Sequence, residues 1–321
     1  MTGPVAAGGS GIVRFGSFAL LVDAIEPFWA EMMLRRFRTA PRPHPGVSPD
    51  MVLRIRFDPD ARPAVLEGDA LRVDRDRDGV RVRCDMMTLD VALTAAPATA
   101  ELKVHDGGAP EPLMEHCFSI FLHKLLQIAG IVRLHAAAVE RPRSGDAILF
   151  HGDKGAGKST LATAFGRAGA RVLADDQIVV RQRNGSIAVS GCDGNVRLTE
   201  KSEVHFLAEP LPVAAQDYGG VWKKEVPLAR LVPAIPYCDR VVSRLYFPRV
   251  GDRFGVTPVG RREALVRILD AVSPAHGFAG PADRIELLRL VSDLVAPVEC
   301  FDLELSPDLA DLERVVERLS G

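Results

Sequence analysis

The sequence predicts an α/β protein made of a smaller β-rich module over residues 1–105 and a strand–loop–helix core over residues 106–321. Three observations support this prediction. Residues 51–103 contain short runs of alternating apolar and polar residues, the pattern of strands with one face in a core. Beyond residue 106, strand-type runs alternate with longer helix-type segments, as in α/β folds. Between one such strand and the next helix, residues 152–159 read GDKGAGKS.

Composition excludes several classes of protein. The 321 residues are 47% hydrophobic and 26% charged, with a net charge of −2, and no basic stripe suggests a nucleic-acid partner. The most apolar early stretch, residues 15–34, contains Asp23, Glu26 and Pro27, so we expect no membrane span. Five cysteines without a C-x-x-C pair predict free thiols in a reducing cytoplasm.

The N-terminal module is expected to begin with a disordered segment over residues 1–12, followed by helical structure over residues 17–37 that breaks at Pro27. A proline-rich loop over residues 41–49 comes next. Strand-type runs with turn residues between them predict a small antiparallel sheet of about four strands, at residues 52–57, 70–74, 80–83 and 91–93.

The core begins with an amphipathic helix over residues 112–129, whose apolar residues recur at helical spacing. Strands are predicted at residues 131–140, 146–151, 171–181 and 298–305, with a β-rich stretch over residues 187–247. Helices are predicted at residues 160–168, 262–272, 281–295 and 307–319.

Residues 152–159 match the phosphate-binding pattern G-x-x-x-x-G-K-[ST] at every fixed position. Glycines let the backbone turn tightly and bring its N–H groups to phosphate oxygens. Lys158 supplies a mobile positive charge, and Ser159 offers a hydroxyl to Mg²⁺. The predicted nucleotide-binding residues are Gly152, Asp153, Lys154, Gly155, Ala156, Gly157, Lys158, Ser159 and Thr160.

Two adjacent carboxylates, Asp175 and Asp176, interrupt an apolar strand seventeen residues after Lys158. Because neighbouring side chains of a strand point to opposite faces, one can face a metal ion and the other an acceptor. Phosphoryl transfer uses carboxylates in both ways. The alternative is a strand that ends at Ala174, followed by a solvated Asp-Asp turn. His135, on the apolar strand before the loop, fits either a buried core histidine or a catalytic one.

These segments together resemble the HPr kinase/phosphorylase superfamily. LHAAAV around His135, GDKGAGKSTLATAF at residues 152–165 and RAGARVLADDQIVV at residues 167–180 are most similar to its HPr-kinase-related branch, some members of which phosphorylate a serine in lasso-peptide precursors. The resemblance implies a phosphoenolpyruvate-carboxykinase-like P-loop kinase core. It also implies ATP-dependent transfer to a hydroxyl, such as that of Ser in a peptide or small protein.

The resemblance further implies a role for each site residue. Asp175 would accept the proton of the substrate hydroxyl, Asp176 and Ser159 would hold Mg²⁺, and His135 would lie beside Asp175 and orient it. The Glu-x-Arg-Gly-x-Gly loop of the bifunctional members is missing, and residues 191–198 are the nearest stretch. Phosphorylase activity and HPr as the substrate are therefore not expected.

Alternatives remain open at this point. A kinase of a small-molecule alcohol is one, although the N-terminal module favours a macromolecular acceptor on its side of the core. A nucleotide-dependent switch or scaffold is another, although it has no need of an acceptor base. No motif separates ATP from GTP. Arg197 is predicted to contact a phosphate or substrate, or to lie in a surface turn, and Lys223 and Lys224 are candidates for a loop cation near the nucleotide.

Overall fold

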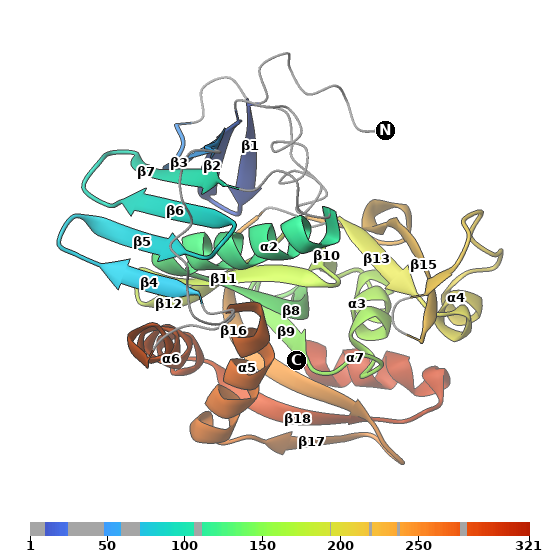
Figure 1. Cartoon of the computed structure of the whole chain (residues 1–321). Coiled ribbons are helices and arrows are strands. Elements are labelled where there is room, and N and C mark those ends of the chain that lie inside the picture. Colours follow the sequence, from blue (N-terminus) through green and yellow to red (C-terminus); the bar gives the residue numbers. More distant parts are fainter. Residues whose placement is uncertain are drawn as a thin grey trace. The chain divides into compact units, whose positions relative to one another are not determined.

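The structure, a computed structural model, describes residues 10–24, 48–58, 71–105, 111–192, 194–217, 220–235, 238–276 and 281–321. The chain folds into two compact units (Figure 1), the first comprising Met1–Val132 and Leu269–Val291 and the second Arg133–Ile268 and Ser292–Gly321. The division falls inside one strand, β8 (Ile131–Glu140), and inside two helices, α5 (Arg261–His276) and α6 (Pro281–Val295). Both units combine helices with sheets, so the prediction of an α/β protein is confirmed.

The first unit contains a seven-stranded mixed sheet with the order β1-β2-β3-β7-β6-β5-β4. Its strands are β1 (Ser10–Phe15), β2 (Phe18–Ala24), β3 (Met51–Phe57), β4 (Arg72–Arg75), β5 (Gly79–Arg83), β6 (Met87–Ala92) and β7 (Ala98–Val104). Strand β3 runs parallel to both β2 and β7. The prediction of a four-stranded antiparallel sheet is therefore wrong in the number of strands and in their direction. Strands β1, β2 and β7 join the four predicted strands, and β3 is parallel to both of its neighbours.

Strand β2 also corrects the helix predicted over residues 17–37. Nearly every residue of β2 is apolar and buried, so its sequence has no clear two-residue period, and a short apolar run fits a buried strand or a helix equally well. Pairing with β1 on one side and β3 on the other decides the outcome. Residues 25–37 of that prediction lie outside the described residues.

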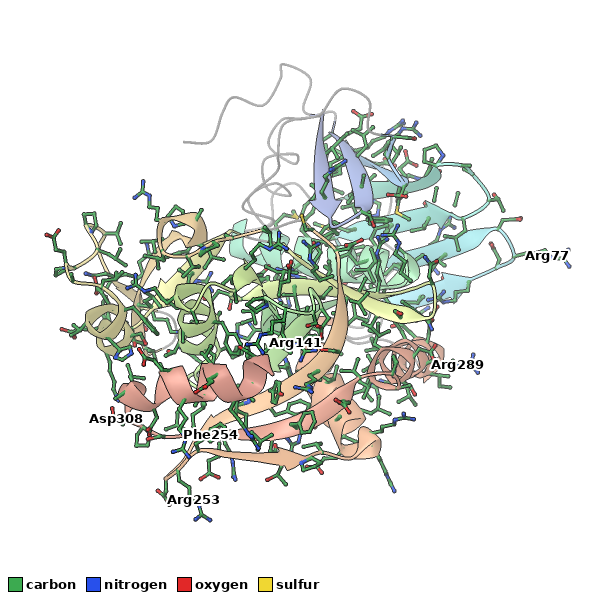
Figure 2. The ribbon with its side chains drawn as sticks, turned by 180° about the vertical axis from the view of Figure 1, so that it is seen from behind. Arg77, Arg141, Arg253, Phe254, Arg289 and Asp308 are labelled. Carbon is green, nitrogen blue, oxygen red and sulfur yellow. The ribbon has the colours of Figure 1, made fainter. Side chains whose placement is uncertain are left out.

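Along β3, β5, β6 and β7, one face of this sheet is buried and the other is polar or charged. On β6, for example, Met87, Leu89 and Val91 are buried, whereas Asp90 between them pairs with Lys103 of β7 at 3.6 Å, as expected of a sheet with one solvated face. Helix α2 (Glu111–Ile128) belongs to the same unit and contacts β5 and β6. Figure 2 shows Arg77, at the turn between β4 and β5, extending away from the sheet.

The second unit contains an eight-stranded sheet in which β10-β8-β11-β12-β16-β18-β17 follow in order and β9 pairs with both β8 and β16. Its strands are β8 (Ile131–Glu140), β9 (Ala147–His151), β10 (Arg171–Ala174), β11 (Gln177–Arg183), β12 (Ser186–Gly191), β16 (Arg240–Val250), β17 (Gly255–Pro258) and β18 (Glu299–Leu305). Strands β9, β16 and β18 are parallel to one another. Their carboxyl ends therefore meet at one edge of the sheet, where ligands of α/β sheets usually bind.

Among the described residues, the second unit also contains three further α-helices, two short 3₁₀ helices and a small sheet, besides the parts of α5 and α6 that fall within it. The small sheet has the order β13-β15-β14. The elements are α3 (Lys158–Arg167), α4 (Glu200–Phe206), α7 (Leu312–Ser320), η1 (Leu228–Arg230), η2 (Leu309–Asp311), β13 (Asn195–Leu198), β14 (Gln216–Asp217) and β15 (Trp222–Pro227). At the β16–β17 turn, Phe254 packs against the core of this unit, whereas the neighbouring Arg253 extends outward (Figure 2).

The strand predicted over residues 171–181 is two strands. Strand β10 ends at Ala174, the chain bends at Asp175 and Asp176, and β11 begins at Gln177. Strand β10 pairs with β8, whereas β11 pairs with β12. The bend thus places the two carboxylates at a strand end rather than within a strand. Among the described helices, none is long and apolar enough to cross a lipid bilayer.

Candidate functional site

A cavity of about 350 Å³ in the second unit collects most of the residues that the sequence singles out. It is lined by His135, Lys154, Gly155, Gly157, Lys158, Ser159, Thr160, Asp176, Arg197, Thr199, Lys201, Ser202, Val221, Lys223, Val250, Leu305, Ser306, Pro307, Leu309 and Leu312. Larger hollows of about 850 and 690 Å³ are lined by none of the predicted catalytic, nucleotide-binding or metal-binding residues. We therefore take the smaller cavity as the candidate site, because it holds the convergent polar groups.

The loop over residues 152–159 joins β9 to α3, so the predicted strand–loop–helix arrangement is confirmed. Gly155 and Gly157 have φ values of 84° and 97°, a left-handed conformation that side chains other than glycine rarely adopt. A Cβ atom on Gly157 would also lie 2.9 Å from Leu305 Cδ1. The backbone shape of this loop therefore depends on glycine, and helix α3 adds its positive dipole end at the same place.

Lys158 is the first residue of α3, and its ammonium group folds back over the loop. Lys158 Nζ donates to the carbonyl oxygens of Gly152 at 2.7 Å and Asp153 at 3.0 Å. The side chain is only 6% exposed. Burial lowers the pKa of Lys158, and the nearby charges of Asp176 and Asp175 oppose that shift. The ammonium group is thus held at the cavity by two neutral acceptors that a stronger anion can replace.

Asp175 is almost completely buried, at 1% exposure. Its Oδ2 accepts from the Arg197 backbone N–H at 3.0 Å, and the Ser159 hydroxyl also donates to this carboxylate. Asp175 Oδ1 is buried without a hydrogen-bond partner among the described residues. Burial raises the pKa of Asp175 to about 6, against the effect of these two hydrogen bonds. A buried carboxylate oxygen without a partner is costly and is well suited to a cation.

Asp176 makes different contacts. Its Oδ1 lies 3.0 Å from His135 Nδ1, and its Oδ2 accepts from Arg197 Nη1 at 2.6 Å. Burial would raise the pKa of Asp176, but the hydrogen bond from His135 and the charges of His135, Arg197 and Lys158 outweigh burial and lower it to about 2. The two carboxylates thus share Arg197, but Asp175 otherwise faces Ser159 and Asp176 faces His135. Their turn is not the solvated one that we considered as the alternative.

The position of His135 differs from the prediction. We expected this ring beside Asp175, but it contacts Asp176. The reason is the bend after Ala174, which directs the first carboxylate inward to Ser159 and the second toward β8 and the cavity. The His135 side chain is 55% exposed, so it is not a buried core histidine.

Arg197 and the two lysines, Lys223 and Lys224, lie on strands of the small sheet. Arg197 lies on β13, not in a surface turn, and its Nε donates to Glu225 Oε2 at 2.8 Å. Lys223 lines the cavity. Lys224, the next residue of β15, instead bonds Glu203 Oε1 at 2.9 Å, as the two-residue period of a strand requires.

Of the predicted loop residues, Gly152, Asp153 and Ala156 do not line the cavity, and the other six do. Sequence reasoning missed the lining residues contributed by the start of α4, the residue before β15, the ends of β16 and β18, η2 and α7: Thr199, Lys201, Ser202, Val221, Val250, Leu305, Ser306, Pro307, Leu309 and Leu312. The rarity of lysine was a usable signal, because four of the seven lysines in the sequence line this cavity.

The residues present fit a magnesium ion. Mg²⁺ is usually bound through one or two protein oxygens, with water and phosphate completing its shell. Ser159 and the partnerless Oδ1 of Asp175 supply such oxygens. Within the described ranges, no group of three or more His, Cys, Asp or Glu side chains forms a site that holds a metal by protein ligands alone.

Comparison with known proteins yields no matching family model and no matching curated protein. Among solved structures, the chain is similar to the Hpr(Ser) kinase/phosphatase from Coxiella burnetii, with 11% sequence identity and a TM-score of 0.30. The similarity covers 58% of this chain and 92% of that one. At such a low TM-score, function must be argued from the chain's own residues.

Proposed function

We propose that the second unit is an ATP-dependent kinase that transfers the γ-phosphate to a hydroxyl group, in particular that of Ser in a peptide or small protein. The observation that carries this proposal is the pair of adjacent carboxylates beside a glycine-rich loop. One of them contacts the loop hydroxyl of Ser159, and the other contacts His135 at the cavity. GTP would fit the same phosphate-binding groups.

The loop would bind the phosphates. Its amides at Gly155 and Gly157, together with the start of α3, form the kind of anion site found at helix N-termini. Lys158 would exchange its two carbonyl contacts for phosphate oxygens, and Lys223 would add a second positive charge at the cavity. Catalysis of this type depends mainly on positioning and charge neutralisation.

Ser159 and Asp175 would hold Mg²⁺. This ion would neutralise the negative charge of the phosphates. Asp175 would be ionised in that state, since the cation supplies the partner that its Oδ1 does not have among the described residues. This assignment gives Asp175 the metal-binding role that the family resemblance implies for Asp176, and it gives the role of the base to His135.

The pair formed by His135 and Asp176 would face the acceptor. Because His135 Nδ1 lies against a carboxylate, this nitrogen carries the ring proton, and Nε2 keeps the lone pair. His135 Nε2 would then take the proton of the acceptor hydroxyl, while Asp176 orients the ring and stabilises its charged form. Arg197 holds Asp176 in place through the 2.6 Å contact.

Two other functions are distinguishable from this one. A nucleotide-dependent switch would bind ATP without transferring phosphate. A small-molecule alcohol kinase would transfer phosphate without a peptide. The proposed role of the first unit is to contact a macromolecular acceptor.

The proposal is tested by incubating the full-length protein with ATP, Mg²⁺ and serine-containing peptides, including short precursors with a serine at the C-terminus. Mass spectrometry should detect a phosphorylated peptide, and the matched variants His135→Ala and Asp176→Asn should bind ATP but transfer phosphate at least ~10²-fold more slowly. ATP binding without transfer to any peptide, alcohol or water would favour the switch. Unchanged transfer in both variants would contradict the assigned roles.

A further inference from the structure

One side of the cavity is apolar. We call Val250, Leu305, Pro307 and Leu309 the apolar wall, since all four line the cavity. Val250 is the last residue of β16 and is 56% exposed. Leu309 packs against the hydrophobic core of the unit. Apolar surface in a cleft usually contacts a ligand. The exposed side chain of Val250 is therefore a candidate for ligand contact.

The strand order separates this wall from the His135 side of the cavity. Strands β8, β9, β16 and β18 lie side by side in that order, since Phe150 of β9 pairs with Ala137 of β8 on one side and Tyr246 of β16 on the other. His135 lies on β8, whereas Val250 pairs with Leu305 at the ends of β16 and β18. The glycine-rich loop leaves β9, so it lies between the two sides.

The wall begins at the loop itself. Leu305 Cδ1 lies so close to Gly157 that a Cβ atom there would be 2.9 Å away. Beyond Leu305, the chain is held in shape by Lys201 Nζ, which donates to the Pro307 carbonyl at 2.6 Å, and by Asp308, whose backbone N–H donates to Ser306 Oγ at 3.2 Å. The apolar wall is therefore preformed and adjoins the proposed phosphate-binding amides.

We infer that the apolar wall binds the nucleobase of the nucleotide. This inference rests on the proposed function, which places the phosphates at residues 155–159 and the acceptor on the His135 side. The base must then lie on the remaining side, where a flat aromatic ring can cover Val250, Pro307 and Leu309 and remove their surface from water. An apolar side chain of the acceptor peptide is the competing occupant.

The test compares Mg²⁺·ATP with Mg²⁺·tripolyphosphate, which has the phosphates but no base, by calorimetry on the full-length protein. ATP should bind at least ~10-fold more tightly. Val250→Asn should weaken ATP binding by about 5- to 10-fold and leave tripolyphosphate binding unchanged, as expected for the loss of one apolar contact. Val241→Asn is the matched control, since Val241 lies on the same strand with 52% exposure and does not line the cavity.

The inference would be overturned if the wild type bound ATP and tripolyphosphate with equal affinity, or if Val250→Asn lost the same affinity for both ligands. Neither result would contradict the proposed phosphate site. A Val250→Asn variant with unchanged ATP affinity but a higher KM for the peptide would assign the wall to the acceptor instead. If the wild-type protein binds neither ligand, the proposed function itself fails, and the inference fails with it.

Discussion

Replacing Asp175 with Asn should stabilise the ligand-free protein at neutral pH, although it removes a residue of the proposed site. Burial raises the pKa of Asp175 from 3.8 to about 6. A folded-state pKa above the unfolded value gives a stabilising contribution that is full below pH 3.8 and is lost as pH rises through about 6. At about 1.4 kcal/mol per pKa unit, this loss is about 3 kcal/mol for a fully buried group.

The adjacent residue should respond in the opposite sense. The pKa of Asp176 is lowered from 3.8 to about 2, and its side chain is 15% exposed. Its stabilising contribution is therefore present above pH 3.8 and is lost as pH falls through about 2. Asp176→Asn should cost about 2 kcal/mol at neutral pH by the same conversion.

The assay is urea unfolding of the full-length protein in EDTA, at pH 4 and at pH 8. The quantity to compare is the difference in free energy of unfolding between each variant and the wild type. For Asp175→Asn this difference should become more favourable by up to about 3 kcal/mol between pH 4 and pH 8. For Asp176→Asn it should be unfavourable at pH 8. A loss of stability at pH 8 in both variants would refute the view that the Asp175 carboxylate is destabilised by its burial, with an Oδ1 that has no partner among the described residues.

Four further results are expected. Lys158→Ala should weaken Mg²⁺·ATP binding at least ~10-fold by calorimetry, since it removes a charge from the loop; unchanged affinity would contradict the phosphate assignment. Lys223→Ala should slow transfer without changing the melting temperature. Lys224→Ala should lower the melting temperature, because buried Glu203 loses its ion-pair partner; the reverse pattern would be inconsistent with the structure. His135→Ala should slow transfer ~10²–10⁴-fold; an unchanged transfer rate would mean that the ring has no role in catalysis. Gly191→Ala should destabilise the second unit by about 1–3 kcal/mol, since its Cβ would lie 2.1 Å from the Leu173 carbonyl oxygen; an unaltered unfolding curve would mean that the two strands are not in contact there.

Elements with a clear local pattern were predictable. Helix α2, strands β8 and β9 and the loop before α3 agree with the predictions to within a few residues, because periodicity and glycine positions are local properties of the chain. The helix predicted across β2 is wrong because its uniformly apolar sequence takes its conformation from neighbouring strands.

The sequence predicted which residues belong to the site better than it predicted the contacts that they make. The spacing of Asp175 and Asp176 brings both to the loop, but their partners depend on a bend after Ala174 and on Arg197, which is twenty-one residues from Asp176. The apolar wall had no local signature, since Val250 and Leu305 meet only through the pairing of β16 with β18.

The most direct test of the central claim is a titration of the full-length protein with ATP, performed in Mg²⁺ and again in EDTA, for the wild type and for Asp175→Asn. The wild type should bind ATP at least ~10-fold more tightly in Mg²⁺ than in EDTA, because Ser159 and Asp175 are the proposed ligands of the ion. In Asp175→Asn, most of this dependence on Mg²⁺ should disappear. Absence of ATP binding by the wild type, or full Mg²⁺ dependence in the variant, would contradict the account.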